Sequence, residues 1–85
     1  MNKVFIVKYH YEAEDFERCM DSITGAYSTR EKAEKALAEE KADVRGHETW
    51  ITDDKVETDV PGFFEAYDPY GCDRVEISIE EQEIR

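Results

Sequence analysis

The sequence predicts a small α+β domain in which a mostly antiparallel sheet of about four to five strands carries one main helix, about residues 29–44, packed on one face. Three observations lead to this prediction. β-Branched and aromatic residues dominate the N-terminus, one capped amphipathic segment follows Ser28, and apolar and polar residues alternate near the C-terminus. With 85 residues, the chain has room for a single domain, residues 1–85.

Residues 3–11 are expected to form an interior strand of the sheet. A strand places successive side chains on opposite faces, so the apolar side chains divide between the two faces. Val4 and Ile6 lie on one face, and Phe5, Val7, Tyr9 and Tyr11 lie on the other. A strand that is apolar on both faces is typical of a position away from the sheet edge.

The acidic block at residues 12–21 is compatible with two structures. Phe16, Cys19, Met20 and Ile23 have the i, i+3, i+4, i+7 spacing of a short amphipathic helix. A long, charged hairpin loop would have the same composition. The segment Gly25-Ala26-Tyr27 then predicts a second strand that ends where the main helix begins.

The main helix has the clearest local signal. Ser28-Thr29-Arg30-Glu31 fits a capping box, in which the Ser28 hydroxyl accepts from the Glu31 amide and the Glu31 carboxylate reaches back to the Ser28 amide. Glu31 and Lys35 are placed for an i, i+4 ion pair, and Gly46 is expected to end the helix.

The predicted buried stripe of this helix consists mostly of small residues. Ala33, Ala36, Leu37 and Val44 share one face. Because the alanine side chain is small, the helix is expected to lie close to a sheet.

The C-terminal half predicts further strands. Residues 47–52 and 56–60 read as a hairpin whose turn is Asp53-Asp54-Lys55, and Pro61-Gly62 ends that pattern. Residues 63–67 are expected to form a short helix or an irregular packing segment, and residues 68–71 a turn. Val75, Ile77 and Ile79 alternate with polar residues, which predicts a half-buried strand.

The net charge of −11, from 22 Asp and Glu against 11 Lys and Arg, is the main clue to function. Such a domain repels nucleic acid and attracts basic surfaces within about one Debye length, ~8–10 Å at ordinary salt. We therefore expect a basic nucleic-acid-binding protein or complex as partner, with no direct nucleic acid binding and no membrane binding. The simpler alternative is that the acidic composition only keeps the chain soluble.

Metal and catalytic chemistry are not predicted. His10, His47, Cys19 and Cys72 lack the short ligand spacings of structural zinc sites, and we expect neither a metal nor a cofactor. Cys19 is expected in the core and Cys72 in a turn, both as free thiols. The acidic residues 53–59 lack the glycine and terminal glutamate of a calcium loop, which favours a solvated hairpin. With no glycine-rich phosphate loop and no nucleophile beside a base, the chain is not expected to be an enzyme.

The carboxylates themselves are the candidate binding groups. Glu76 and Glu80 share a face of the last strand, where every second residue is about 7 Å apart. DNA presents one phosphate about every 3.4 Å of axis per strand, so ordered carboxylates could substitute for a phosphate backbone. Tyr67 and Tyr70 could stack on arginine, although tyrosines covering a core of Phe63 and Phe64 are the plainer reading. The predicted partner-binding residues are Glu57, Asp59, Tyr67, Asp68, Tyr70, Asp73, Glu76 and Glu80.

The first half of the chain resembles small, acidic, uncharacterised α+β proteins of phages and prophages. The resemblance rests on the opening strand, on Gly25-Ala26-Tyr27-Ser28, and on the helix start at residues 28–36. Proteins of this kind include anti-CRISPR and other anti-restriction inhibitors, some of which are DNA mimics. The resemblance transfers no functional residue to this chain.

Two functions follow as expectations. The first is a phage-encoded, non-enzymatic inhibitor that acts in the cytoplasm of a bacterial host and occludes the basic nucleic-acid groove of a defence complex, such as a CRISPR effector. The cytoplasmic location follows from an N-terminus that reads as a strand, not as a secretory signal, and from the lack of any apolar stretch near ~18–20 residues. The second is a structural or interaction module of a phage or prophage that homodimerises through its sheet edge or through the face around Trp50.

Overall fold

The computed structural model describes residues 2–12, 20–69 and 73–84. Within these residues the structure contains five strands, one long helix and one 3-10 turn. In chain order these are β1 (Asn2–Glu12), β2 (Met20–Tyr27), α1 (Arg30–His47), η1 (Asp53–Lys55), β3 (Val56–Val60), β4 (Phe63–Asp68) and β5 (Asp73–Ile84).

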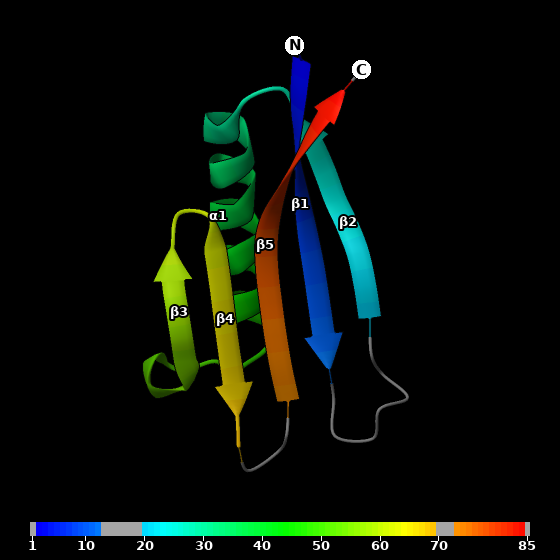
Figure 1. The fold of residues 1–85 in the computed structure, drawn as a ribbon. Helices are drawn as coiled ribbons and strands as arrows, with labels where there is room; N and C mark the ends of the chain where they lie inside the picture. Colours follow the sequence, from blue (N-terminus) through cyan, green and yellow to red (C-terminus); the bar gives the residue numbers. More distant parts are fainter. Residues whose placement is uncertain (1, 13–19, 70–72, 85) are drawn as a thin grey trace.

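The strands form one sheet in the order β2-β1-β5-β4-β3, and every neighbouring pair is antiparallel. The predicted α+β class and the single helix on one face are confirmed. Figure 1 shows α1 behind the sheet, while none of the helices among the described residues covers the face toward the viewer. We call this uncovered side the open face. β2 and β3 are the two edge strands, and β1 is interior, as predicted.

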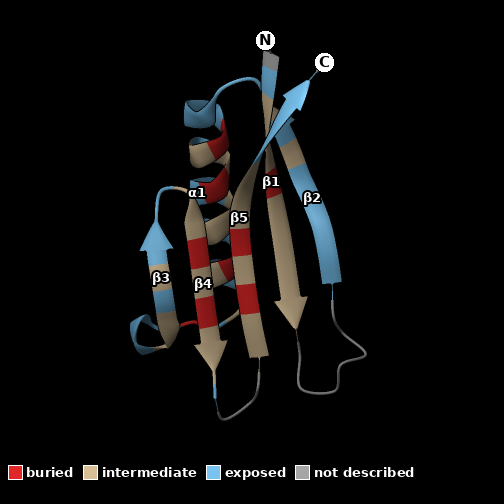
Figure 2. Cartoon of the chain, viewed as in Figure 1, coloured by how far each residue is buried: buried red, intermediate tan, exposed pale blue. Residues whose placement is uncertain are grey.

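The core lies between α1 and the sheet. Alternation along β1 and β5 turns Val7, Val75 and Ile77 toward the helix, where each is fully buried (Figure 2). Among the described residues, the buried cluster consists of Val7, Ala33, Leu37, Val44, Ile51, Phe64, Ala66, Val75 and Ile77. Three residues of the predicted helix stripe, Ala33, Leu37 and Val44, are buried in this cluster, and Ala36 is partly buried against it.

The ends of α1 differ from the prediction by one to three residues. Thr29, not Ser28, is the N-cap, and its hydroxyl accepts from the Lys32 amide at 3.2 Å. The capping box with Glu31 is therefore wrong, because Ser28 and Thr29 both serve to turn the chain from β2 into the helix. The helix continues through Gly46 to His47, and the Glu48 amide closes it on the Val44 carbonyl at 2.8 Å.

The predicted helix around residues 16–23 is wrong in its C-terminal part. Met20 and Ile23 belong to β2, where their side chains are 57% and 65% exposed. Pairing with β1 decides this, because Ile23 lies opposite Lys8 and Met20 opposite Tyr11. Phe16 and Cys19 lie outside the described residues.

Two predictions for the C-terminal half are also wrong. Residues 48–52 form a turn that buries Ile51, so β3 has no hairpin partner there and pairs instead with β4. Residues 63–68 form a strand, because Phe64 and Ala66 face the helix while the residues between them face the open side. The predicted alternation of Val75, Ile77 and Ile79 is confirmed in β5, whereas Tyr70 and Cys72 lie outside the described residues.

The same substitution at two isoleucines tests where the core lies. Ile77 is fully buried in β5, and Ile23 is 65% exposed in β2. Ile77→Ala is expected to lower the free energy of unfolding by about 2–5 kcal/mol, since it removes packed methyl groups and leaves a cavity. Ile23→Ala is expected to cost less than about 1 kcal/mol. Urea denaturation followed by circular dichroism measures both, and equal losses would contradict this core.

Candidate functional site

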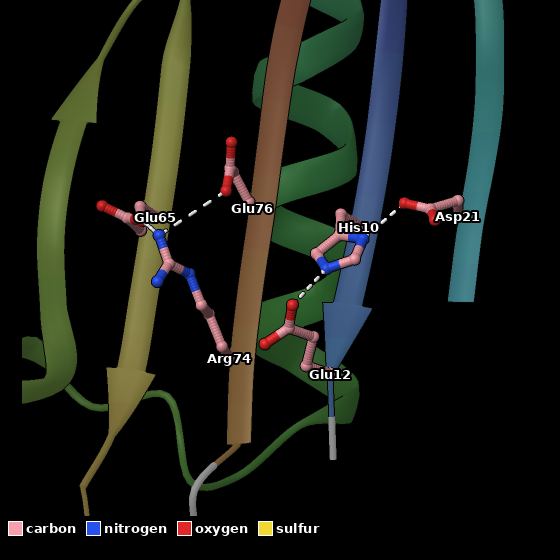
Figure 3. Close-up of polar contacts among 6 residues, drawn as sticks. All are labelled: His10, Glu12, Asp21, Glu65, Arg74 and Glu76. Carbon is pink, nitrogen blue, oxygen red and sulfur yellow. Dashed lines mark hydrogen bonds and ion pairs between the residues drawn. The ribbon is translucent and has the colours of Figure 1, made fainter. Parts of the chain in front are cut away.

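The open face carries a row of charged side chains across β2, β1, β5 and β4. His10 lies opposite Asp21 on one side and Glu76 on the other, and Glu76 lies opposite Glu65. Cross-strand partners share a face of a sheet, so these side chains form one continuous polar row (Figure 3).

His10 is held at both ring nitrogens. Its Nε2 contacts the Glu12 carboxylate at 2.8 Å, and its Nδ1 contacts the carboxylate of Asp21. Two carboxylate acceptors are satisfied together only when both nitrogens carry a proton, that is, by an imidazolium. The hydrogen bonds that His10 donates to Glu12 and then to Asp21 accordingly raise the His10 pKa above its ordinary value of 6.5.

Arg74 compensates two facing carboxylates. Its guanidinium contacts Glu65 and also lies 3.7 Å from Glu76 (Figure 3). Glu65 and Glu76 are directly opposite each other on β4 and β5, an arrangement that repels without a cation between them. The Glu65 side chain is only 13% exposed, so water screens its charge little and Arg74 is the main source of compensation.

Glu80 is paired in the same way. Lys8 Nζ lies 2.8 Å from its carboxylate, and this hydrogen bond lowers the Glu80 pKa below its ordinary value. Beside these pairs is an open hollow of about 690 Å³, lined by Lys8, Tyr9, His10, Asp21, Ser22, Ile23, Glu76 and Ser78. Within the described ranges, no three His, Cys, Asp or Glu residues form a group that could hold a metal ion. The open face is therefore a surface of internally compensated charge.

A second surface lies on the helix side, between α1 and the edge strand β2. We call it the acidic groove. It has a volume of about 350 Å³ and is lined by Thr24, Tyr27, Ala36, Glu39, Glu40 and Asp43. The Tyr27 ring folds back over Gly25, where a Cβ atom would lie 2.6 Å from the tyrosine hydroxyl. The groove thus has an aromatic wall and a rim of carboxylates.

The carboxylates of the acidic groove lack lysine or arginine partners among the residues that the structure describes. Among the described residues Glu39 and Glu40 form no ion pair, and the Asp43 carboxylate pairs with His47, whose Nδ1 lies 3.5 Å away. Helix geometry places Glu39 and Asp43 one turn apart, about 6 Å along the axis. Burial raises the pKa of the nearby Tyr9 to about 12, and the charge of Glu48, followed by smaller effects of Glu40 and Asp43, acts in the same direction.

On the opposite flank of α1, toward β3, lysine and arginine side chains pair with carboxylates. Lys41 pairs with Asp59 at 2.8 Å and lies 6.0 Å from the centre of the Phe64 ring, and Arg45 pairs with Asp53 at 2.7 Å. At the start of the helix, Arg30 pairs with Glu34 at 3.1 Å, in place of the predicted Glu31–Lys35 pair. Lys41 and Arg45 of α1 thus pair with carboxylates on the β3 side, and neither pairs with the carboxylates of the acidic groove.

The predicted partner-binding residues lie on both faces of the sheet. Alternation places Tyr67, Glu76 and Glu80 on the open face and Asp59, Asp68 and Asp73 on the helix side. Glu57 is exposed at the register shift of β3, and Tyr70 lies outside the described residues.

Four of these predicted residues already face cations of the protein. Asp59 pairs with Lys41, Asp68 with Lys55, Glu76 with Arg74 and Glu80 with Lys8. The structure therefore does not assemble the predicted set into one surface.

Sequence reasoning did not single out Glu39, Glu40, Asp43 or Glu48. A helical projection contained part of the signal, since Glu39 and Asp43 lie beside Ala36 on one flank, whereas Lys41 and Arg45 lie on the other. The position of that flank over β2 could not be read from the chain.

No family model, no curated protein and no solved structure matches this chain. Among the helices in the described ranges, none has both the length and the apolar character of a membrane span.

Removing Arg74 tests the compensation on the open face. Arg74→Met is expected to lower the free energy of unfolding by about 1–2 kcal/mol, because Glu65 and Glu76 then repel each other without a cation. The double variant Arg74→Met/Glu76→Gln removes that repulsion and is expected to recover most of the loss. Urea denaturation at pH 7 measures both, and a double variant no more stable than Arg74→Met would contradict this role.

The contacts of His10 with Glu12 and Asp21 predict that the stability of the protein depends on pH. Because folding raises the His10 pKa above 6.5, its contribution is complete below that value and disappears as the pH rises through the folded pKa. The wild-type protein is thus expected to lose stability as the pH rises from 6.5 through the folded pKa of His10. His10→Gln should flatten this dependence, whereas His47→Gln, a matched change on α1, should retain the part due to His10. Denaturation at several pH values measures the slope, and NMR titration measures both histidines. A His10 pKa at or below 6.5 in the folded protein would contradict the contacts with Glu12 and Asp21.

Proposed function

We propose that this protein is a non-enzymatic binding protein that occupies a basic, nucleic-acid-binding surface of another protein and so excludes the nucleic acid. The observation that carries the proposal is the acidic groove, a concave surface whose carboxylates have no lysine or arginine partner within the described residues. Uncompensated carboxylates are available to an external cation, whereas those of the open face are already paired.

The chemistry of such a partner follows from the groove. Surfaces that bind nucleic acid hold lysine and arginine toward phosphates, and carboxylates satisfy the same donors. The aromatic wall formed by Tyr27 adds a face on which a guanidinium can stack. The net charge of −11 attracts a basic partner at long range and repels nucleic acid itself.

A role without catalysis is consistent with how the polar side chains are used. Both ring nitrogens of His10 are engaged by carboxylates, so neither is free to exchange a proton with a substrate. The charged residues beside the open-face hollow are likewise held in ion pairs, through Lys8–Glu80 and Arg74–Glu76.

In its narrowest form, the proposal makes this a phage-encoded inhibitor of a bacterial defence complex, such as a CRISPR effector. That narrower form rests on the sequence resemblance alone. The resemblance indicates which targets to assay first, namely CRISPR effectors and other defence complexes. The negative charge of the groove indicates that the bound surface of the target is basic.

A displacement assay tests the proposal. A labelled DNA duplex is bound to a guide-loaded CRISPR effector or, as a general probe, to a sequence-nonspecific bacterial DNA-binding protein. Its release by this protein is followed by fluorescence anisotropy. We expect stoichiometric release at 50 mM salt and a loss of about tenfold or more in potency at 300 mM salt, because the contacts are between charges.

Two double variants with the same charge change locate the surface. Glu39→Gln/Asp43→Asn should weaken displacement at least about tenfold, since it removes two charge-assisted contacts. Glu57→Gln/Glu83→Gln, at exposed positions elsewhere, should weaken it less than about threefold. Absence of displacement for every probe would contradict the proposed function, and equal weakening by both variants would show that net charge, not the groove, is responsible.

A further inference from the structure

We infer that the edge strand β2 is a docking edge that pairs, main chain to main chain, with an extended basic segment of the partner. This inference rests on the proposed function, because it assigns a binding mode to the acidic groove. It requires an unpaired strand edge, carboxylates placed beside it, and a reason why the other edge is not used.

β2 offers a long edge with few protective features. It contains eight residues, borders only β1, and carries a single charged side chain, that of Asp21. Met20 and Ile23 expose apolar side chains on its two faces. A bulge at Thr24, whose hydroxyl donates to the Val7 carbonyl at 3.2 Å, adds twist but no charge. Strands of this kind present free N–H and C=O groups to an incoming strand.

The edge strand β3 is better protected against pairing. It contains only five residues, has a register shift at Glu57, and is followed directly by Pro61. Asp59 on this strand is already paired with Lys41 of α1. Short length, charge, a bulge and proline are the features that discourage pairing at a sheet edge. The two edges of the sheet are therefore not equivalent.

The charge beside β2 selects a basic occupant. On the helix side, Glu39, Glu40 and Asp43 line the acidic groove together with Thr24 and Tyr27 of β2. In an added strand, alternate side chains would face this groove, and an arginine or lysine there comes within reach of the carboxylates. On the open face, Asp21 is 81% exposed at the same edge.

A second copy of this chain fits the edge less well. Pairing two β2 strands about a two-fold axis would bring two acidic grooves together, and each copy has a net charge of −11. Like charges placed opposite each other destabilise an interface. The occupant that complements the edge is therefore a basic strand from another protein.

A pair of synthetic peptides tests main-chain pairing. The probe is a blocked nonapeptide of arginine alternating with valine and threonine, and its control is the same peptide with N-methylated backbone amides. Calorimetry at 50 mM salt should show binding of the probe and at least about 100-fold weaker binding of the control, because several main-chain hydrogen bonds are lost. Hydrogen exchange should slow at amides in residues 20–27 when the probe is bound.

Two matched variants assign the edge. Ile23→Lys and Val60→Lys place the same charge at exposed apolar positions of β2 and β3. Ile23→Lys should weaken the probe at least about tenfold, and Val60→Lys less than about threefold. Circular dichroism confirms that both variants fold.

The outcomes separate this inference from the proposed function. If both peptides bind equally and their binding weakens with salt, the docking edge is overturned while an electrostatic binding role stands. Equal effects of Ile23→Lys and Val60→Lys also overturn the assignment to β2. A free protein that is dimeric by light scattering, with the amides of residues 20–27 already protected, would show that a second copy occupies the edge.

Discussion

The packing of one helix across one face of a five-stranded sheet is the constraint on which the rest of this structure depends. An α-helix is about 10 Å wide, whereas five strands span about 19 Å, so one helix cannot cover the whole face. α1 buries Ala33, Leu37 and Val44 against the middle of the sheet and leaves the edge strands largely exposed. The acidic groove beside β2 lies on the helix side, where α1 does not reach the sheet edge, whereas the open face is the opposite side of the sheet from α1.

The open face shows how a sheet surface without a second layer remains stable in water. Its central residues are charged, but Arg74, Lys8 and His10 bring the carboxylates into ion pairs. Exposed ion pairs contribute little to stability individually, and their main effect here is to remove repulsion between neighbouring strands. Repulsion between carboxylates is thus reduced on the open face, where the strands pair closely. Carboxylates without lysine or arginine partners among the described residues lie on the helix side, in the acidic groove.

That uncompensated charge is concentrated by the two different flanks of α1. The flank toward β3 uses Lys41 and Arg45 to hold the segment from residue 53 to residue 59, while the flank toward β2 carries Glu39 and Asp43. An acidic flank beside an unpaired strand edge combines directional main-chain donors and acceptors with a field that selects cationic partners. A solvated acidic surface alone would offer only the field.

Local patterns in the chain were sufficient to predict some elements and insufficient for others. The alternation in β1 and β5, and the alanine stripe of α1, are periodic signals that arise from burial on one side, and the structure has these elements where they were expected. Met20 and Ile23 have helical spacing but pair as a strand, and residues 63–67, predicted as a short helix or an irregular packing segment, belong to strand β4. In both segments, hydrogen bonding to β1 or β5 outweighs local preference.

The sequence by itself determined the class of fold, the buried stripe of the helix and the excess of negative charge, because each depends on composition and on periodicity along the chain. Only the tertiary structure decided which carboxylates are neutralised. Ion pairs such as Lys41–Asp59 and Arg74–Glu65 join residues from different elements, and strand order decides which flank of α1 lies over β2. The electrostatic surface is therefore a property of the assembled sheet and helix, since it depends on distances between residues far apart in the chain.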